Sequence, residues 1–282
     1  MFQGFFNEDV ELGKIDDLNN SDAIVIWAED LKERLPVLYL RVRQAVKNGV
    51  KLIVFGHTNR TLDDVAEIFY SDEVVSENFE IIKDLTKLED FKSLIVEKNV
   101  TAIIGKSTPQ QSDSSINKLF DFLNSNSNLK ILNAFTKGNT YGAFQILDNL
   151  KGTKDFVNEV NSENTDLLFV VAADPIGRSI YSKQVKKVFD EIKTVVSLDN
   201  FKHETSELAD VIVPISSTLG EKNGTFTNIE FRTSRIDKLV PSPGQTVSDW
   251  EFITSLMNFS GLSNNSYSLE ELNTKAFEDL DI

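Results

Sequence analysis

Apolar residues occur along the chain in two recurring patterns. One is a short run rich in Val, Ile and Leu, which has the length and composition of a buried strand. The other is a longer segment in which apolar residues return every three or four positions, as in a helix with one buried face. The two patterns alternate along most of the chain and predict strands separated by helices.

The first half contains several strands and helices in this alternation. Residues 31–47 place Leu38, Val42 and Ala45 on one helical face, and Gly49 marks the end of that helix. Because this helix lies between two strand-like runs, it predicts a βαβ unit with adjacent parallel strands. The strands are expected at 23–28, 51–56, 101–105 and 129–133, and the helices at 31–47, 61–69, 87–98, 109–124 and 139–150.

The polar stretch 151–165 is the best candidate for a boundary between two units. Beyond it the alternation resumes, with an apolar strand at 166–173 that reads as fully buried. The sequence therefore predicts an α/β fold of two Rossmann-like βαβ units with mainly parallel sheets, one over 1–150 and one over 151–282, the second carrying a hairpin and C-terminal helices. The other elements expected there are a helix at 181–191, strands at 194–198 and 211–213, and an amphipathic helix from Ser248.

Composition excludes several classes of function. The chain has 282 residues with 40% hydrophobic side chains, enough for a substantial core. A formal net charge of −15 argues against binding nucleic acid, because phosphate contacts need clustered Lys and Arg. Zero cysteines exclude disulfides, thiolate catalysis and cysteine-held iron–sulfur clusters in these residues. No apolar run is long enough to span a membrane, and the start of the chain resembles neither a secretory signal nor a typical transit peptide.

The sequence offers no recognisable catalytic or metal-binding constellation. The only histidines, His57 and His203, lie far apart and outside any metal-ligand spacing. There is no nucleophile elbow and no glycine fingerprint of a dinucleotide site. We therefore expect no catalytic residue and no metal ligand.

One stretch, residues 204–235, combines unusual residues at fixed offsets from an apolar run. A short strand-like run ends at Pro214, and a loop rich in small polar side chains follows it. This stretch resembles the signature of the molybdopterin oxidoreductase family. The matching residues are Glu204, Thr205, Ala209, Asp210, Pro214, Glu221, Gly224, Thr225, Phe226, Asn228, Glu230 and Arg232.

The resemblance implies a fold like that of this family and a hairpin that lies against the pterin nucleotide in cofactor-bearing relatives. Two departures from the pattern weaken the expected cofactor site. Phe231 stands where the family usually has Gly, and Gly56, His57 and Thr58 stand where molybdenum enzymes usually have Asp-Pro-Arg. We therefore expect no bound cofactor, and only a degenerate pterin-site motif formed by Glu221, Gly224, Thr225, Asn228 and Arg232.

The segment around the first predicted helix is also similar to the large iron–sulfur subunit of NADH:quinone oxidoreductase, respiratory complex I. The residues that carry this likeness are Arg34, Pro36, Val37, Leu38, Leu40, Arg41, Arg43, Ala45, Gly49, Lys51 and Val54. It implies a cofactor-free structural or assembly domain, the C-terminal molybdopterin oxidoreductase-like part of that subunit, which supports electron transfer from NADH to quinone. Its partners would be other peripheral-arm subunits of complex I, with iron–sulfur clusters on a missing N-terminal module or a partner chain.

That resemblance also implies a location at the membrane surface, on the cytoplasmic side of a bacterial inner membrane or the matrix side of the mitochondrial inner membrane. Two alternatives stay open from the sequence. The chain is also consistent with a fragment of a molybdopterin-dependent oxidoreductase such as formate dehydrogenase, and with a stand-alone α/β module that binds a small molecule.

Overall fold

The chain forms two compact α/β units, and each is described by itself. One unit comprises Met1–Ala143 and Thr227–Arg232, and the other comprises Phe144–Phe226 and Thr233–Ile282. The predicted division between residues 150 and 151 falls shortly after the first of these breaks. The computed structural model describes residues 11–27, 30–55, 61–62, 64–70, 93–105, 127–135, 137–146, 153–160, 164–217, 220–262 and 267–278.

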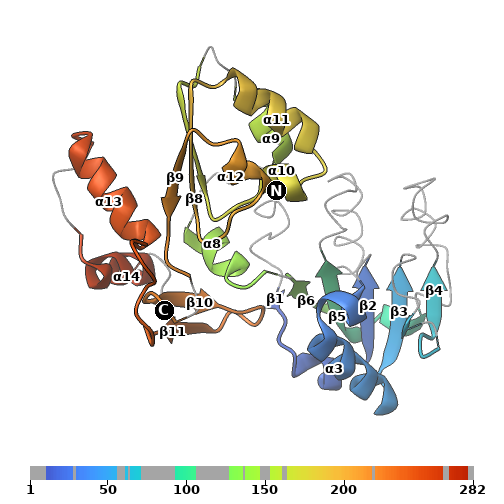
Figure 1. Cartoon of the computed structure of the whole chain (residues 1–282). Coiled ribbons are helices and arrows are strands. Elements are labelled where there is room, and N and C mark those ends of the chain that lie inside the picture. The colour runs from blue at the N-terminus through green and yellow to red at the C-terminus, as the bar shows by residue number, and fades with distance from the viewer. Residues whose placement is uncertain are drawn as a thin grey trace. The chain divides into compact units, whose positions relative to one another are not determined.

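The first unit is built on a six-stranded sheet with the order β1-β6-β5-β2-β3-β4. Its strand pairs are parallel, which confirms the mainly parallel α/β fold expected for this half (Figure 1). The strands are β1 Glu11–Leu12, β2 Ala23–Trp27, β3 Lys51–Phe55, β4 Ile68–Tyr70, β5 Lys98–Gly105 and β6 Ser127–Ala134, and the helices are α1 Asp17–Asn20, α2 Leu31–Arg34, α3 Pro36–Lys47 and α8 Thr140–Ile146, whose last residues belong to the second unit.

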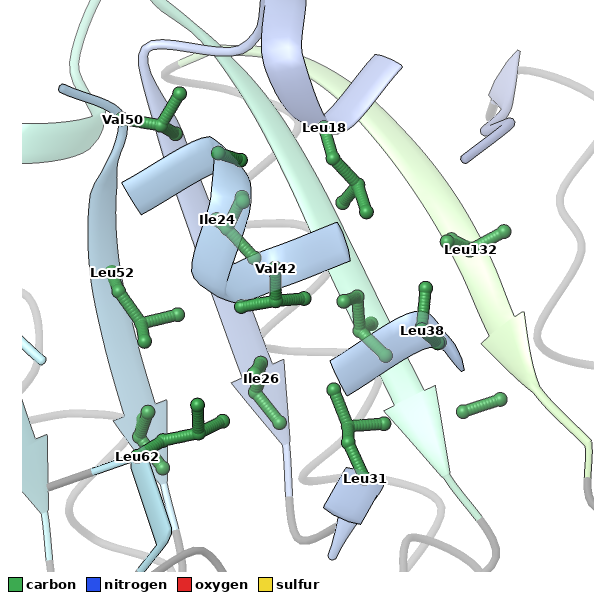
Figure 2. Close-up of a cluster of buried hydrophobic side chains, with 14 residues drawn as sticks. Leu18, Ile24, Ile26, Leu31, Leu38, Val42, Val50, Leu52, Leu62 and Leu132 are labelled. Carbon is green, nitrogen blue, oxygen red and sulfur yellow. The ribbon is translucent and has the colours of Figure 1, made fainter. Parts of the chain in front are cut away.

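Helix α3 covers one face of this sheet and forms its core with β2 and β3. Leu38 and Val42 of α3 are buried against Ile24 and Ile26 of β2 (Figure 2). The sequence predicts a single helix over 31–47, but the structure divides it into α2 and α3 at Leu35. The reason is proline at position 36, whose ring restricts the residue before it and lacks an N–H for the helical ladder.

The second unit is built on a three-stranded parallel sheet with the order β7-β8-β9. Val185 and Phe189 of α11 pack with Val170 and Val195 on one face of the sheet. The strands are β7 Leu167–Val171, β8 Thr194–Asp199, β9 Val211–Pro214 and the separate pair β10 Gly224–Thr227 with β11 Thr233–Ile236, and the helices are α9 Thr153–Glu159, α10 Pro175–Arg178, α11 Ser182–Glu191, α12 Glu204–Glu207, α13 Asp249–Phe259 and α14 Leu269–Glu278.

The opposite face of this second sheet is incompletely covered, which contradicts the expectation of fully buried strands. Val196 and Leu198 of β8 are buried there, with Phe252 of α13 packed against them. Phe169, however, is 36% exposed and Val211 is 48% exposed. The apolar pattern predicted these strands correctly. Hydrophobicity alone does not indicate whether a second layer covers that face of the sheet.

Several other expectations need correction. Residues 61–69 do not form a helix, because strand β4 begins at Ile68 and pairs with β3. Strand β5 begins at Lys98, where the sequence predicts the end of a helix. The short helices α10 and α12 follow strand ends and are too brief to show a helical period. The helix predicted at 109–124 and the first half of the one predicted at 87–98 lie outside the described residues, and within the described second half residues 93–95 are helical.

Candidate functional site

The turn between β10 and β11 is held by the side chain of Asn228. Its amide oxygen accepts hydrogen bonds from the backbone N–H groups of Glu230, at 2.9 Å, and Arg232, at 3.0 Å. The backbone N–H of Asn228 donates to the Arg232 carbonyl, at 3.1 Å. Asparagine suits such a turn because its short side chain can replace a backbone acceptor. Asn228 therefore stabilises the turn itself.

Phe231 occupies this turn with φ +61°, in the left-handed region that side chains disfavour. Its ring lies edge-on to the ring of Tyr141, with the ring centroids 3.9 Å apart. The backbone angle gives glycine a second advantage at this position, in addition to the space that a missing side chain leaves. The chain keeps a glycine-like backbone here while carrying a large aromatic side chain.

Other residues fasten this turn to the first unit. The amide oxygen of Asn139 accepts a hydrogen bond from the Thr227 N–H at 2.9 Å. The Glu230 carboxylate accepts one from the Ile15 N–H at 2.8 Å, and Ile229 packs against the core cluster to which α3 contributes. Gly142 is required beside this contact, because a Cβ there would overlap with the side chain of Asn139 and lie 2.8 Å from Oγ1 of Thr227.

Glu221 closes a loop of the second unit rather than projecting from it. Its Oε2 accepts a hydrogen bond from the Ser217 N–H at 2.7 Å, and its carbonyl accepts one from the Ser242 hydroxyl at 3.2 Å. Gly224 has no positive φ, and a Cβ on it would meet nothing within 4 Å. Among the described residues, no close approach therefore explains this glycine.

The five residues of the predicted degenerate motif are therefore distributed over two units. Glu221, Gly224 and Thr225 belong to the second unit, and Asn228 and Arg232 belong to the turn in the first. Glu221 and Asn228 have clear structural roles, while Thr225 is half-buried and Arg232 is exposed. The predicted departure at Gly56, His57 and Thr58 lies outside the described residues.

Sequence reasoning missed a polar cluster at the carboxyl ends of β7 and β8. Oδ1 of Asp174 accepts hydrogen bonds from the Thr205 hydroxyl, at 2.6 Å, and from the Gly177 N–H, at 3.0 Å. Nε2 of His203 lies 2.9 Å from Oδ2 of Asp199. An acidic residue at or near the carboxyl end of each strand was the available signal, Asp174 three residues after β7 and Asp199 at the last position of β8, because the carboxyl edge of a parallel sheet gathers such side chains.

The hydrogen bonds of this cluster indicate the tautomer of a neutral His203 and lower the pKa of Asp174. Nδ1 of His203 accepts from the Ser206 N–H, at 3.2 Å, at the start of α12, so the proton of a neutral imidazole lies on Nε2 and faces Asp199. Burial alone would raise the pKa of Asp174. The hydrogen bonds from Thr205 and Gly177 outweigh it, and the pKa lies below its usual 3.8.

The first unit also contains a cavity of about 230 Å³ at the amino ends of its strands, lined by residues that include Thr101, Asn128 and Lys130. Its one ammonium group is already paired, because Nζ of Lys130 lies 2.8 Å from Glu11 and 3.0 Å from Asp17.

Within the described ranges no three His, Asp or Glu side chains gather as a metal site. In the same part of the chain no helix is long and apolar enough to cross a membrane.

Comparisons with known proteins agree with this architecture. The family described as "Molybdopterin oxidoreductase" matches residues 3–259. The chain is 33% identical over 129 residues to F420-dependent formate dehydrogenase 2 subunit alpha of Methanococcus maripaludis, covering 42% of this chain and 19% of that protein. It is 34% identical over 107 residues to the assimilatory nitrate reductase catalytic subunit of Bacillus subtilis, covering 38% of this chain and 15% of that protein.

A solved structure, acetylene hydratase from Pelobacter acetylenicus, shares the fold with a TM-score of 0.53 at 14% identity. The match covers 86% of this chain and 47% of that one. The curated relatives are matched over less than a fifth of their own length. These comparisons therefore identify the kind of domain but describe only a part of each larger protein.

Proposed function

This chain belongs to the molybdopterin oxidoreductase family, and we propose that it serves as one α/β part of a formate dehydrogenase-like oxidoreductase. The redox groups of that enzyme would lie outside these 282 residues. The observation that supports the proposal most is the family hairpin itself. The amide oxygens of Asn228 and Asn139 accept hydrogen bonds from backbone N–H groups of its turn. Support comes from the likeness to F420-dependent formate dehydrogenase alpha subunits of Methanococcus maripaludis and Methanocaldococcus jannaschii.

We propose that the described residues do not by themselves form a complete site for a molybdopterin dinucleotide. Its phosphates need N–H donors or cations, whereas the cluster at the ends of β7 and β8 presents the carboxylates of Asp174 and Asp199. Glu221 and the amide oxygen of Asn228 are occupied by backbone N–H groups of their own loops. We therefore propose that these residues act as a scaffold and that the pterin is held elsewhere in the enzyme.

We also propose that the iron–sulfur clusters of the enzyme lie outside these 282 residues. Such clusters need cysteine thiolates, and the sequence contains none. These residues would then contact a cysteine-rich module or partner chain and contribute structure to the complex.

Purification of the tagged chain from its native cells tests this function. We expect a stoichiometric complex by native mass spectrometry that contains iron, sulfide and molybdenum and oxidises formate with a dye acceptor. A second purification of the isolated chain should contain no molybdenum and give no pterin fluorescence after oxidation. A chain that is monomeric in cells, or one that retains tightly bound molybdenum by itself, would overturn the proposal.

A second candidate is the cofactor-free domain of the large iron–sulfur subunit of complex I, favoured by the aromatic ring of Phe231 at the family's glycine position. In that case the partners are peripheral-arm subunits, and the complex lies on the cytoplasmic side of a bacterial inner membrane or on the matrix side of the mitochondrial one. The same purification separates the two candidates, because a complex I assembly reduces quinone with NADH and does not oxidise formate.

A further inference from the structure

The outward side of α2 and α3 is basic, although the protein as a whole is acidic. Its side chains are exposed and combine basic groups with two aliphatic ones, Val37 at 65% and Leu40 at 63% exposure. We call this surface the α3 outer face. It consists of Lys32, Arg34, Val37, Leu40, Arg41, Gln44 and Lys47.

The charge of this segment is opposite to that of the whole chain. Residues 31–48 contain five basic residues and one acidic residue, Glu33, whereas the chain carries a formal net charge of −15. One of the five, Arg43, is bound to Asp64 through two hydrogen bonds of 3.2 Å on the flank of the helix. Within the described part of the chain, no ion pair joins Arg41 or Lys47 to a carboxylate.

The aliphatic side chains of the α3 outer face do not pack in the core of the unit. That role belongs to Leu38, Val42 and Ala45 on the opposite side of the helix, all of which are at most 2% exposed. Figure 2 shows Leu38 and Val42 among the strand side chains that α3 covers. Val37, Leu40, Arg41 and Gln44 instead form a second stripe at spacings of three and four residues.

The size of the apolar strip distinguishes two kinds of partner. A helix that binds a lipid surface buries a broad apolar face in the acyl region, but α3 has already buried its broad face against the sheet. Two aliphatic residues flanked by cations are better matched by the side of another helix that carries an apolar pair between carboxylates.

We propose that the α3 outer face binds an acidic amphipathic helix of another polypeptide in the enzyme complex. This inference rests on the proposed function and adds the chemistry of one contact to it. Leu40 and Val37 would contact the apolar residues of that helix, and Arg41 and Lys47 would pair with its carboxylates. Such contacts are polar at the rim and apolar at the centre, as in other interfaces between subunits.

The test places the photo-cross-linking residue benzoylphenylalanine at position 40 of the full chain in its native cells. We expect the cross-linked peptide, sequenced by mass spectrometry, to be an acidic helical segment of a subunit that also co-purifies with the unmodified chain. Arg41→Glu should lower the cross-linking yield about tenfold, since it places like charges opposite one another. Replacing the nearest acidic residue of the identified helix by arginine should restore the yield.

Lys187→Glu is the matched control, because Lys187 is also exposed on a helix, α11 of the other unit. This control should leave the yield unchanged. A basic or uncharged cross-linked peptide, a yield insensitive to Arg41→Glu, or flotation of the chain with phosphatidylglycerol vesicles would overturn the inference. If the complex assembles without a cross-link at position 40, the inference fails and the proposed function stands. If no complex is found, both fail.

Discussion

At Phe231 glycine is expected to give a more stable protein than alanine, which is the reverse of the usual order. In ordinary loops and strands alanine is more stabilising than glycine, because glycine loses more backbone freedom on folding. At Phe231 the backbone has φ +61°, where any side chain costs about 1–2 kcal/mol relative to glycine. We therefore expect Phe231→Gly to be more stable than Phe231→Ala by about 1 kcal/mol.

Both variants lose the ring contact with Tyr141, at a cost of about 0.5–1.5 kcal/mol beyond the lost apolar burial, so this contact cancels in the comparison. The assay is urea unfolding followed by circular dichroism. Ser234 of β11 provides a control in the same hairpin, since it is exposed and does not have a positive φ. At position 234 the free energy of unfolding of the alanine variant should exceed that of the glycine variant by about 0.5–1 kcal/mol. Equal stabilities at both positions, or a more stable alanine at 231, would refute the role of the backbone angle.

Three further predictions concern packing and pH. Gly142→Ala should lower the free energy of unfolding by about 1–3 kcal/mol, because the added methyl group overlaps with the side chains that fasten the turn. Gly224→Ala should change it little, since that methyl group meets nothing within 4 Å, and urea titration of the pair compares the two. Leu38→Ala should cost about 2–5 kcal/mol because this side chain is 2% exposed in the core, while Leu40→Ala should change stability by less than about 0.5 kcal/mol. The lowered pKa of Asp174 contributes stability that is present above its unfolded value of about 3.8 and is lost as the pH falls through the folded pKa. Acid titration should therefore unfold the wild type more steeply below about pH 4 than Asp174→Asn, which is already less stable at neutral pH because a hydrogen-bonded carboxylate is lost. Parallel acid curves for the two proteins would contradict this assignment.

The sequence predicted the longer strands of both units and the helices α3, α11 and α13, because each has a strong period over enough residues. The run at 51–56 and the stripe through Leu38 and Val42 are examples, and the structure confirms both. The division at Leu35 and the strand β4 were missed, because a proline effect and a three-residue strand leave little periodic signal.

The cluster around Asp174 was missed for a different reason. Asp199 and His203 are brought to Asp174 and Thr205 only by the pairing of β7 with β8, which places two strand ends at one edge of the sheet. Sequence distance hides this, since Asp174 and Thr205 are separated by a complete βαβ crossover. Local spacing therefore identified the strand ends but not the contact between them.

Several residues of the family signature at 204–235 make hydrogen bonds that hold the fold and do not require a ligand. Asn228 accepts from two N–H groups of its own turn, Glu221 accepts from Ser217, and Thr205 donates to Asp174. Hydrogen bonds made within the chain preserve the hairpin whether or not a ligand is present. The matched spacing is therefore explained by the folding of the hairpin and does not by itself predict a bound cofactor. Replacing Asn228 by alanine should destabilise the turn in urea unfolding, whereas replacing the side chain of Thr225 or of the exposed Arg232 by alanine should leave the turn folded.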